Sequence, residues 1–191
     1  MQIHAYIVWI TFSIIGLVMI FIIIRSLVYG YSLTGKPTIQ PLFFYTAKLF
    51  FFLNWMLFLA KALFPDFGYI AVPDYLAWTG VVLLLAGSLM FIPGVLTLGS
   101  SLRYGIPEEN TKLKTTGIFR FSRNPLYLGL FIICIGSCLY FPDLFNAFLC
   151  VFTIFYHLKI IKAEETFLFK RFGEEWIAYF SKVRRLLGRK G

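Results

Sequence analysis

The chain has 191 residues, of which 59% are hydrophobic, 20% are aromatic and only 14% are charged. This composition is too apolar for a soluble domain of that length and indicates an integral membrane protein. The formal net charge of +9 comes from 18 Lys and Arg against 9 Asp and Glu. Because most of the basic residues lie at the ends of apolar stretches, we expect them to contact membrane lipids and not nucleic acid.

Five apolar stretches approach or exceed the roughly 20 residues that a helix needs to cross a bilayer. They cover residues 5–29, 42–64, 76–98, 126–141 and 144–162. The first has no basic leader and no small-residue cleavage site, and its run over 5–24 is too long for a signal-peptide core, so we interpret it as a retained transmembrane helix. The predicted fold class is all-α, a polytopic integral membrane protein with five transmembrane helices.

The last two predicted spans are separated by little more than Pro142 and Asp143, and we expect them to form an antiparallel helical hairpin. No loop between the spans is long enough for a soluble domain. We therefore expect one integral membrane domain over 1–191, with three spans in 1–98 and the hairpin and candidate site in 99–191.

Charge predicts the orientation of the spans. Basic residues are concentrated in the first and third loops and in the C-terminal tail, whereas the second loop, PDFGYIAVPD, carries Asp66 and Asp74. Positively charged loops remain on the cytoplasmic side of a membrane. We therefore expect the C-terminus and the candidate site at the cytoplasmic interface and the N-terminus outside.

The C-terminal tail shows a helical pattern. Apolar residues recur at Phe172, Trp176, Tyr179 or Phe180, Val183 and Leu187. The opposite face holds the basic residues Lys170, Arg171, Lys182, Arg184 and Arg185. This pattern predicts a basic amphipathic helix that lies on or against the membrane surface.

Three polar residues interrupt the second predicted span. Lys48 and Lys61 lie near its opposite ends, and their long stems allow the ammonium groups to reach the membrane interfaces. Asn54 lies nearer the middle, and we expect its side chain to hydrogen-bond to a neighbouring helix.

Several familiar catalytic motifs are absent from the sequence. It contains no phosphate-binding GxxxxGK[ST] loop, no GxGxxG, no HExxH, no CxxC and only two histidines, His4 and His157. We therefore expect neither nucleotide hydrolysis nor a metal site.

The stretch GIFRFSRNPLYLG, residues 117–129, places polar groups against the start of the fourth apolar run. Asn124 and Pro125 mark a helix start, since the residue before proline avoids helical angles, proline suits the first helical position and asparagine can cap free amides. The positive end of that helix can receive a carboxylate. A capped helix start with Arg120 and Arg123 on lipid phosphates explains the same residues.

Glu164 and Glu165 are adjacent acids just beyond the fifth apolar run. The hairpin brings them to the same side of the membrane as Asn124, so the two regions are expected to form one site. The alternative is a pair of solvated acids that neutralise Lys159 and Lys162 at helical spacing.

Together these residues offer amides and arginine for a carboxylate, an acid for a cationic amino group, and the rings of Phe119 and Tyr127 for an aromatic base or a cation. A zwitterionic amino acid joined to an aromatic base and a positive sulfur matches this set. S-adenosylmethionine has all of these parts.

The same residues resemble the C-terminal signature of the isoprenylcysteine carboxyl methyltransferase family, which is related to membrane phospholipid methyltransferases. The matching residues are Gly117, Phe119, Arg123, Asn124, Pro125, Tyr127, Gly129, Glu164, Glu165, Phe172, Gly173 and Tyr179. The resemblance covers about residues 112–187, and a chain of five short-looped spans is similar to the small prokaryotic members. Two positions depart from the family: many relatives have histidine at Asn124, and eukaryotic relatives have arginine at Ile160.

The resemblance implies a buried S-adenosylmethionine pocket under the C-terminal helix, with S-adenosylhomocysteine as product and a lipid-like or prenylated substrate that enters between the spans. The residues implied for cofactor binding are Lys112, Leu113, Gly117, Phe119, Asn124, Pro125, Tyr127 and Glu164. The candidates for catalysis or substrate positioning are Arg123, Lys159, Glu164 and Glu165.

The leading hypothesis is methyl transfer to the C-terminal carboxylate of an S-prenylated cysteine, a group that is ionised at neutral pH and needs no general base. In this hypothesis Glu164 binds the cofactor's amino group, Asn124 and Tyr127 hold its carboxylate, and Arg123 or Lys159 positions the substrate.

Three alternatives remain open. The first is methylation of a phospholipid ethanolamine, which is protonated at neutral pH and would need Glu165 or Tyr127 as base. The second is a membrane scaffold whose basic tail binds anionic lipids, and the third is a reductase that uses a nicotinamide cofactor.

Overall fold

The computed structural model describes residues 2–68, 70–103, 105 and 112–189, and within these ranges the chain is helical and forms no β-sheet. The α-helices are α1 (Ile3–Tyr29), α2 (Pro41–Leu63), α3 (Asp74–Leu98), α4 (Pro125–Tyr140), α5 (Leu144–Phe172) and α6 (Glu174–Lys182). Two short 3-10 helices, η1 (Gly99–Ser101) and η2 (Gly117–Arg120), lie between α3 and α4. The all-α prediction is confirmed.

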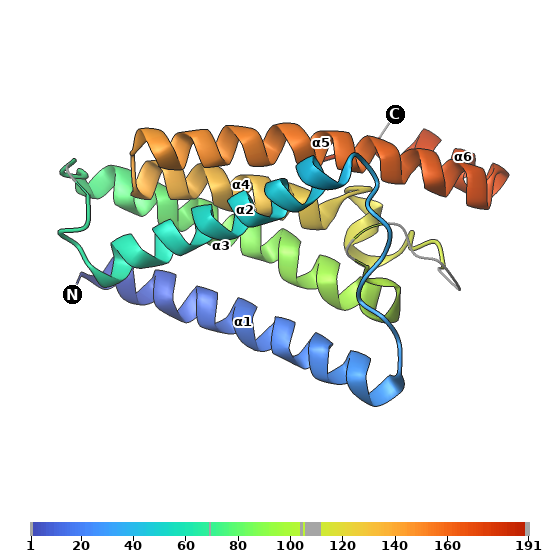
Figure 1. The fold of residues 1–191 in the computed structure, drawn as a ribbon, viewed down its shortest axis with the longest axis horizontal. Helices are drawn as coiled ribbons and strands as arrows, with labels where there is room; N and C mark the ends of the chain where they lie inside the picture. The colour runs from blue at the N-terminus through green and yellow to red at the C-terminus, as the bar shows by residue number, and fades with distance from the viewer. Residues whose placement is uncertain (1, 69, 104, 106–111, 190–191) are drawn as a thin grey trace.

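Helices α1, α2 and α5, and α3 together with η1, are long and apolar enough to cross a membrane. Helix α4 has 16 residues and is about 24 Å long, which is less than the roughly 30 Å of a hydrocarbon core. The chain is thus a multi-pass membrane protein, and a fifth span at α4 stays a prediction. Figure 1 shows α1 to α5 running along the long axis of the molecule, with α6 at the end opposite the N-terminus, called here the α6 end.

Helices α3 and α4 approach each other closely because glycines face each other along their contact. A Cβ added to Gly87 would lie 2.7 Å from the carbonyl oxygen of Gly129, and one added to Gly136 would lie 2.9 Å from that of Gly80. Small residues at regular intervals allow this kind of backbone approach in membrane helices, where dispersion contacts replace the hydrophobic effect. This contact fixes the start of α4 against the end of α3.

A buried polar network joins α2, α4 and α5. Asn54 Nδ2 donates to Asn146 Oδ1 at 2.7 Å, which confirms the predicted bond from Asn54 to a neighbouring helix. Asn146 Nδ2 in turn donates to the carbonyl oxygens of Ser137 at 3.1 Å and Phe141 at 2.9 Å. Because few alternative partners exist in an apolar interior, these bonds fix the register of the three helices.

The predicted hairpin is confirmed by α4 and α5. Asp143 caps α5, its carboxylate accepting from the backbone N–H groups of Phe145 at 2.8 Å and Asn146 at 3.2 Å. Helix α5 continues past the predicted end at residue 162, since the following residues favour helix and contain no glycine or proline before Gly173. It therefore reaches beyond α4 toward α6 (Figure 1).

The prediction that the tail is one helix extending to Leu187 is wrong. Gly173 has a φ of 49°, a left-handed value that suits glycine and separates α5 from α6. Helix α6 then ends at Lys182, and Val183 pairs with Arg189 in an isolated antiparallel bridge. Leu187, expected on the apolar face of that helix, therefore lies beyond the end of α6.

Candidate active site

Asn124 lies immediately before α4 and turns its side chain away from the helix it was predicted to cap. Its Nδ2 donates to Glu165 Oε1 at 3.3 Å and to the carbonyl oxygen of Arg185 at 3.1 Å, and no side-chain bond caps the helix. The capping prediction is therefore wrong, because two acceptors from α5 and the tail hold the amide. Among the described residues no side chain caps the first turn of α4, so its amides are placed to receive an anion.

Glu165 is the centre of a buried charge network. Arg123 approaches Glu165 Oε1 with both Nε and Nη2 at 3.0 Å. Arg185 donates to Glu165 Oε2 from Nε at 2.9 Å and from Nη2 at 2.7 Å. These short, paired, charge-assisted bonds connect α5 to the loop before α4 and to the tail.

The remaining donor group of Arg123 is also occupied by the protein. Nη1 donates to the carbonyl oxygens of Phe180 at 3.2 Å and Val183 at 3.0 Å, and the guanidinium lies 4.1 Å from the centroid of the Phe180 ring. Because its three nitrogens already have protein acceptors, the geometry favours an anchoring role for Arg123 over the predicted contact with substrate.

Tyr179 fixes α6 against η2. Its hydroxyl donates to the carbonyl oxygen of Phe119 at 2.7 Å. Burial raises the pKa of Tyr179, so the phenol stays a neutral donor at physiological pH. Behind it, the backbone N–H of Arg123 donates to the carbonyl of Arg184 at 3.1 Å, so the tail folds across the start of α4.

Glu164 faces a different direction from Glu165, as expected for adjacent residues that differ by about 100° around a helix. Its Oε1 accepts a hydrogen bond from the Tyr127 hydroxyl at 2.8 Å. Its charge also interacts with that of Lys48 on α2. Tyr127 lies beside His157, with 5.7 Å between the ring centroids. Three helices thus contribute to one polar cluster.

This cluster lies in a cavity of about 600 Å³. Toward the α6 end the cavity is bordered mainly by polar and aromatic residues, among them Arg103, Lys112, Phe119, Asn124, Trp176 and Tyr179. Toward the middle of the bundle it is bordered by apolar residues of α1, α2 and α3, among them Phe12, Met19, Phe51, Trp55, Phe91 and Val95. One cavity therefore joins a polar compartment to an apolar one.

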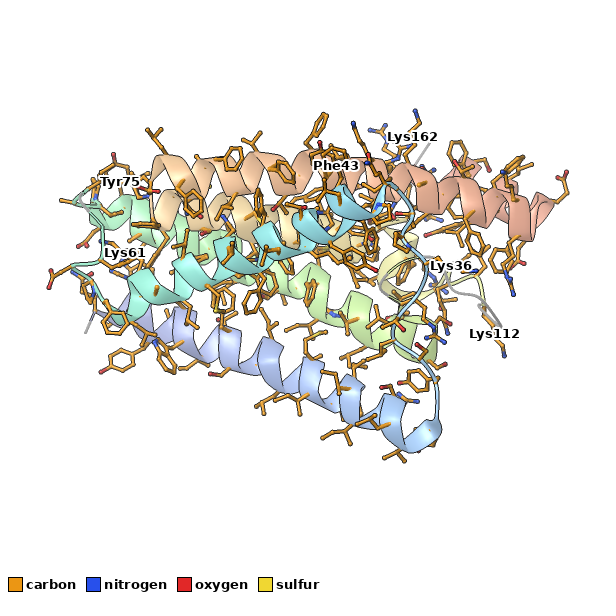
Figure 2. The ribbon with its side chains drawn as sticks, in the orientation of Figure 1. Lys36, Phe43, Lys61, Tyr75, Lys112 and Lys162 are labelled. Carbon is orange, nitrogen blue, oxygen red and sulfur yellow. The ribbon has the colours of Figure 1, made fainter. Side chains whose placement is uncertain are left out.

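Most of the residues predicted for the site border this cavity. They are Lys112, Leu113, Phe119, Arg123, Asn124, Pro125, Tyr127 and Glu164. Figure 2 shows Lys112 at the α6 end, whereas Lys162 points away from the bundle.

Gly117, Glu165 and Lys159 are not among the described residues that border the cavity. Gly117 begins η2 with a φ of 61°, and Glu165 belongs to the arginine network. Lys159 is exposed, with its Nζ 4.5 Å from the centroid of the Phe155 ring.

Among the residues that border the cavity without having been predicted as site residues are Lys48, Arg103, His157 and Trp176. Lys61 does reach the end of its helix, where Nζ donates to the carbonyls of Pro65 at 2.6 Å and Phe67 at 2.7 Å. Lys48 instead lies at the cavity. The sequence does show that Lys48 is a charged residue inside an apolar span. It does not show that the side chain points into the cavity, because that direction depends on the packing between helices.

Comparison with known proteins places these observations in a family. Residues 75–175 match the model of the phospholipid methyltransferase family. The protein-S-isoprenylcysteine O-methyltransferase of Saccharomyces cerevisiae is 29% identical over 128 residues, which are 63% of this chain and 54% of the yeast protein. A probable protein-S-isoprenylcysteine O-methyltransferase of Oryza sativa subsp. japonica is 33% identical over 57% of this chain and 59% of its own length.

The protein-S-isoprenylcysteine O-methyltransferase B of Arabidopsis thaliana is 25% identical over 54% of this chain and 55% of its own length. The chain thus spans between half and two thirds of the length of these curated relatives, from 54% to 59%. No solved structure matches the chain significantly.

Proposed function

The chain belongs to the phospholipid methyltransferase family, and on this basis we propose that it is an S-adenosylmethionine-dependent methyltransferase. Its proposed acceptor is the carboxylate of an S-isoprenylated cysteine or of a similar lipid-like molecule, as the names of its relatives suggest. The observation that carries the proposal is one continuous cavity in which a polar, aromatic compartment meets an apolar one, with Glu164 and Tyr127 among its lining residues.

The chemistry of the polar compartment fits S-adenosylmethionine. The carboxylate of Glu164 suits the cofactor's ammonium group, and the rings of Phe119 and Trp176 suit its adenine and its sulfonium. Because Asn124 does not cap α4, the first amides of that helix, together with Lys112, can receive the cofactor's carboxylate. When bound, S-adenosylmethionine supplies an electrophilic methyl group on a positively charged sulfur.

The apolar compartment fits an isoprenoid chain. Its wall is formed by rings and branched side chains of α1, α2 and α3, which gain free energy when they cover hydrocarbon. A carboxylate held at the junction is already ionised, so the chain has no proton to remove. The task of the residues around it is to exclude water and to hold the carboxylate oxygen in line with the methyl group.

The proposed topology places the α6 end at the cytoplasmic interface and the N-terminus outside. Lys36, Lys112 and Lys162 lie toward the α6 end, whereas Tyr75 and Lys61 lie toward the other end (Figure 2). An excess of Lys and Arg marks the cytoplasmic side of membrane proteins. A site at this interface would be reached by a water-soluble cofactor and by a lipid-like acceptor from the bilayer.

A second candidate acceptor is the ethanolamine headgroup of a phospholipid, since the family model bears the phospholipid methyltransferase name. That amine must lose a proton before it is methylated. Glu165 is paired with two arginines, and the Tyr127 hydroxyl donates to Glu164. These contacts leave neither predicted base ready to accept a proton, which favours the carboxylate acceptor.

The test uses purified protein in detergent, methyl-labelled S-adenosylmethionine and two acceptors offered separately, S-farnesylcysteine and phosphatidylethanolamine. Base-labile label on S-farnesylcysteine would support carboxyl methylation. Label on the lipid amine would support the second candidate. Absence of transfer together with absence of S-adenosylmethionine binding would contradict the proposed function.

A further inference from the structure

Lys48 places a cation at the junction between the two compartments of the cavity. It borders the cavity from α2, as do Phe51 and Phe52 about one helical turn further on, and Glu164 and Tyr127 border the same cavity. Its Nζ lies 4.7 Å from the centroid of the Phe44 ring. A cation inside the membrane-spanning part of a protein is costly and is a candidate for ligand binding.

The charged and polar groups around Lys48 come from α4 and α5. Lys48 lies close enough to Glu164 and His157 for its charge to act on both side chains. His157 Nδ1 lies 2.8 Å from the carbonyl oxygen of Thr153, and since a carbonyl only accepts, Nδ1 must donate. In the neutral ring Nε2 is then an acceptor. With Tyr127 as a neutral donor, Lys48 and Glu164 contribute opposite charges to this cluster, and Arg103, Lys112 and Lys114 border the same cavity.

The balance of these charges changes when the proposed cofactor binds. Near neutral pH, S-adenosylmethionine carries a sulfonium, an ammonium and a carboxylate, so it brings a net charge of about +1. Lys48 and Glu164 carry opposite charges, so the cofactor and the other cations that border the cavity, Arg103, Lys112 and Lys114, leave the loaded site with an excess positive charge. A carboxylate lowers this excess, whereas a protonated amine raises it, and in a cavity of low dielectric that difference is large.

We propose that Lys48 binds the carboxylate of the acceptor and makes the site selective for anionic lipid-like acceptors over cationic headgroups. The geometry that supports this role is the position of Lys48 between the apolar compartment, which takes the hydrocarbon, and the polar compartment, which holds the methyl donor. Specificity of this kind comes from repulsion of the wrong acceptor as well as from attraction of the right one. The inference rests on the proposed methyl transfer.

The test compares the wild type with Lys48→Met, Lys48→Arg and the control Lys162→Met. Lys162 is exposed and points away from the bundle (Figure 2), so its replacement removes the same charge without touching the cavity. Each variant is assayed for the KM of S-farnesylcysteine, for inhibition by the methyl ester of S-farnesylcysteine, and for the Kd of S-adenosylmethionine. The ester keeps the hydrocarbon and lacks the charge.

For Lys48→Met we expect the KM of the acid to rise by about 10- to 100-fold, the range for a lost hydrogen bond to a charged group. Inhibition by the ester and the Kd of S-adenosylmethionine should change by less than about threefold. Lys48→Arg should recover most of the affinity for the acid, and Lys162→Met should match the wild type.

An equal loss of affinity for the acid and the ester would overturn the inference, since it would show that Lys48 only shapes the cavity. An unchanged KM for the acid in Lys48→Met would also overturn it. If Lys48→Met does not fold, as judged by loss of S-adenosylmethionine binding, Lys48→Gln takes its place in the comparison with Lys48→Arg. Failure of the wild type to methylate S-farnesylcysteine would contradict the proposed function itself.

Discussion

Glu164 and Glu165 are neighbours in the sequence, but their carboxylates belong to two different structures. Glu164 accepts from Tyr127 at 2.8 Å and borders the cavity, whereas Glu165 lies between Arg123 and Arg185 at 3.0 and 2.7 Å. The first acid is placed to meet a ligand and the second to hold the tail over the start of α4. Replacing each acid by glutamine should therefore have different effects, on ligand binding for Glu164 and on stability for Glu165.

Glu164→Gln should weaken cofactor binding while it preserves the fold. Loss of the negative charge removes a charge-assisted bond to the proposed ammonium group, which corresponds to about 10- to 100-fold in Kd. Isothermal titration with S-adenosylmethionine and with S-adenosylhomocysteine measures the change. Wild-type affinity in this variant would contradict the assignment of Glu164 to the cofactor.

Glu165→Gln should destabilise the protein more than it alters the cavity. Removing one partner of a buried ion network leaves Arg123 with an uncompensated charge, a change that costs about 3–5 kcal/mol. We expect a lower apparent Tm in detergent and faster proteolytic removal of the tail after α6. Glu164→Gln, which leaves both arginines paired with Glu165, is the matched control. Equal Tm values for the two variants would contradict the assignment of Glu165, and not Glu164, to holding the tail.

Much of the fold follows from the sequence because each determinant is local. Apolar length predicts the helices, Pro142 and Asp143 predict the hairpin, and Asn54 predicts a bond between helices. The end of the tail helix was predicted wrongly, since apolar spacing up to Leu187 does not reveal the backbone pairing of Val183 with Arg189. That pairing depends on a turn and on the long-range hydrogen bond from the N–H of Gly188 to the carbonyl oxygen of Phe121 at 2.8 Å.

Residue types were enough to suggest which side chains of the motif lie together. They did not predict the contacts that depend on the direction in which a side chain points. Tyr127 and Glu164 were proposed together and do share a hydrogen bond. Arg123 was expected to face the substrate, but its donors meet Glu165 and backbone carbonyls supplied by α6 and the residue after it. Lys48 lies far from the motif of residues 117–129 in the sequence and enters the cavity only through the packing of α2 against α5.

Gly136→Ala and Gly16→Ala test the close approach of α3 and α4. A Cβ at Gly136 would lie 2.9 Å from the carbonyl oxygen of Gly80, whereas a Cβ at Gly16 on α1 meets no atom within 4 Å. We expect Gly136→Ala to lower the apparent Tm, because overpacking costs about 1–3 kcal/mol. Gly16→Ala should leave the Tm unchanged or raise it, since alanine favours helix by about 0.5–1 kcal/mol. Similar behaviour of the two variants would show that α3 and α4 are not held by this contact.

Arg123 and Arg185 share one carboxylate but should differ in energetic importance. The Arg123 side chain is 3% exposed and also donates to two backbone carbonyls, whereas the Arg185 side chain is 44% exposed. Arg123→Met removes the buried partner of Glu165, which keeps Arg185, and leaves these carbonyls without their donor, so we expect a loss of about 3–5 kcal/mol that salt does not relieve. For Arg185→Met, solvent screening reduces the expected loss to about 1 kcal/mol or less.

Thermal melts of both arginine variants at low and high ionic strength measure this difference. Salt should reduce the gap between wild type and Arg185→Met, since mobile ions screen exposed pairs over about 10 Å at 0.1 M. The gap for Arg123→Met should persist, because its guanidinium is buried between α5 and α6. Equal losses with equal salt dependence would show that the network acts as a surface cluster and not as the buried anchor that holds α6 above the cavity.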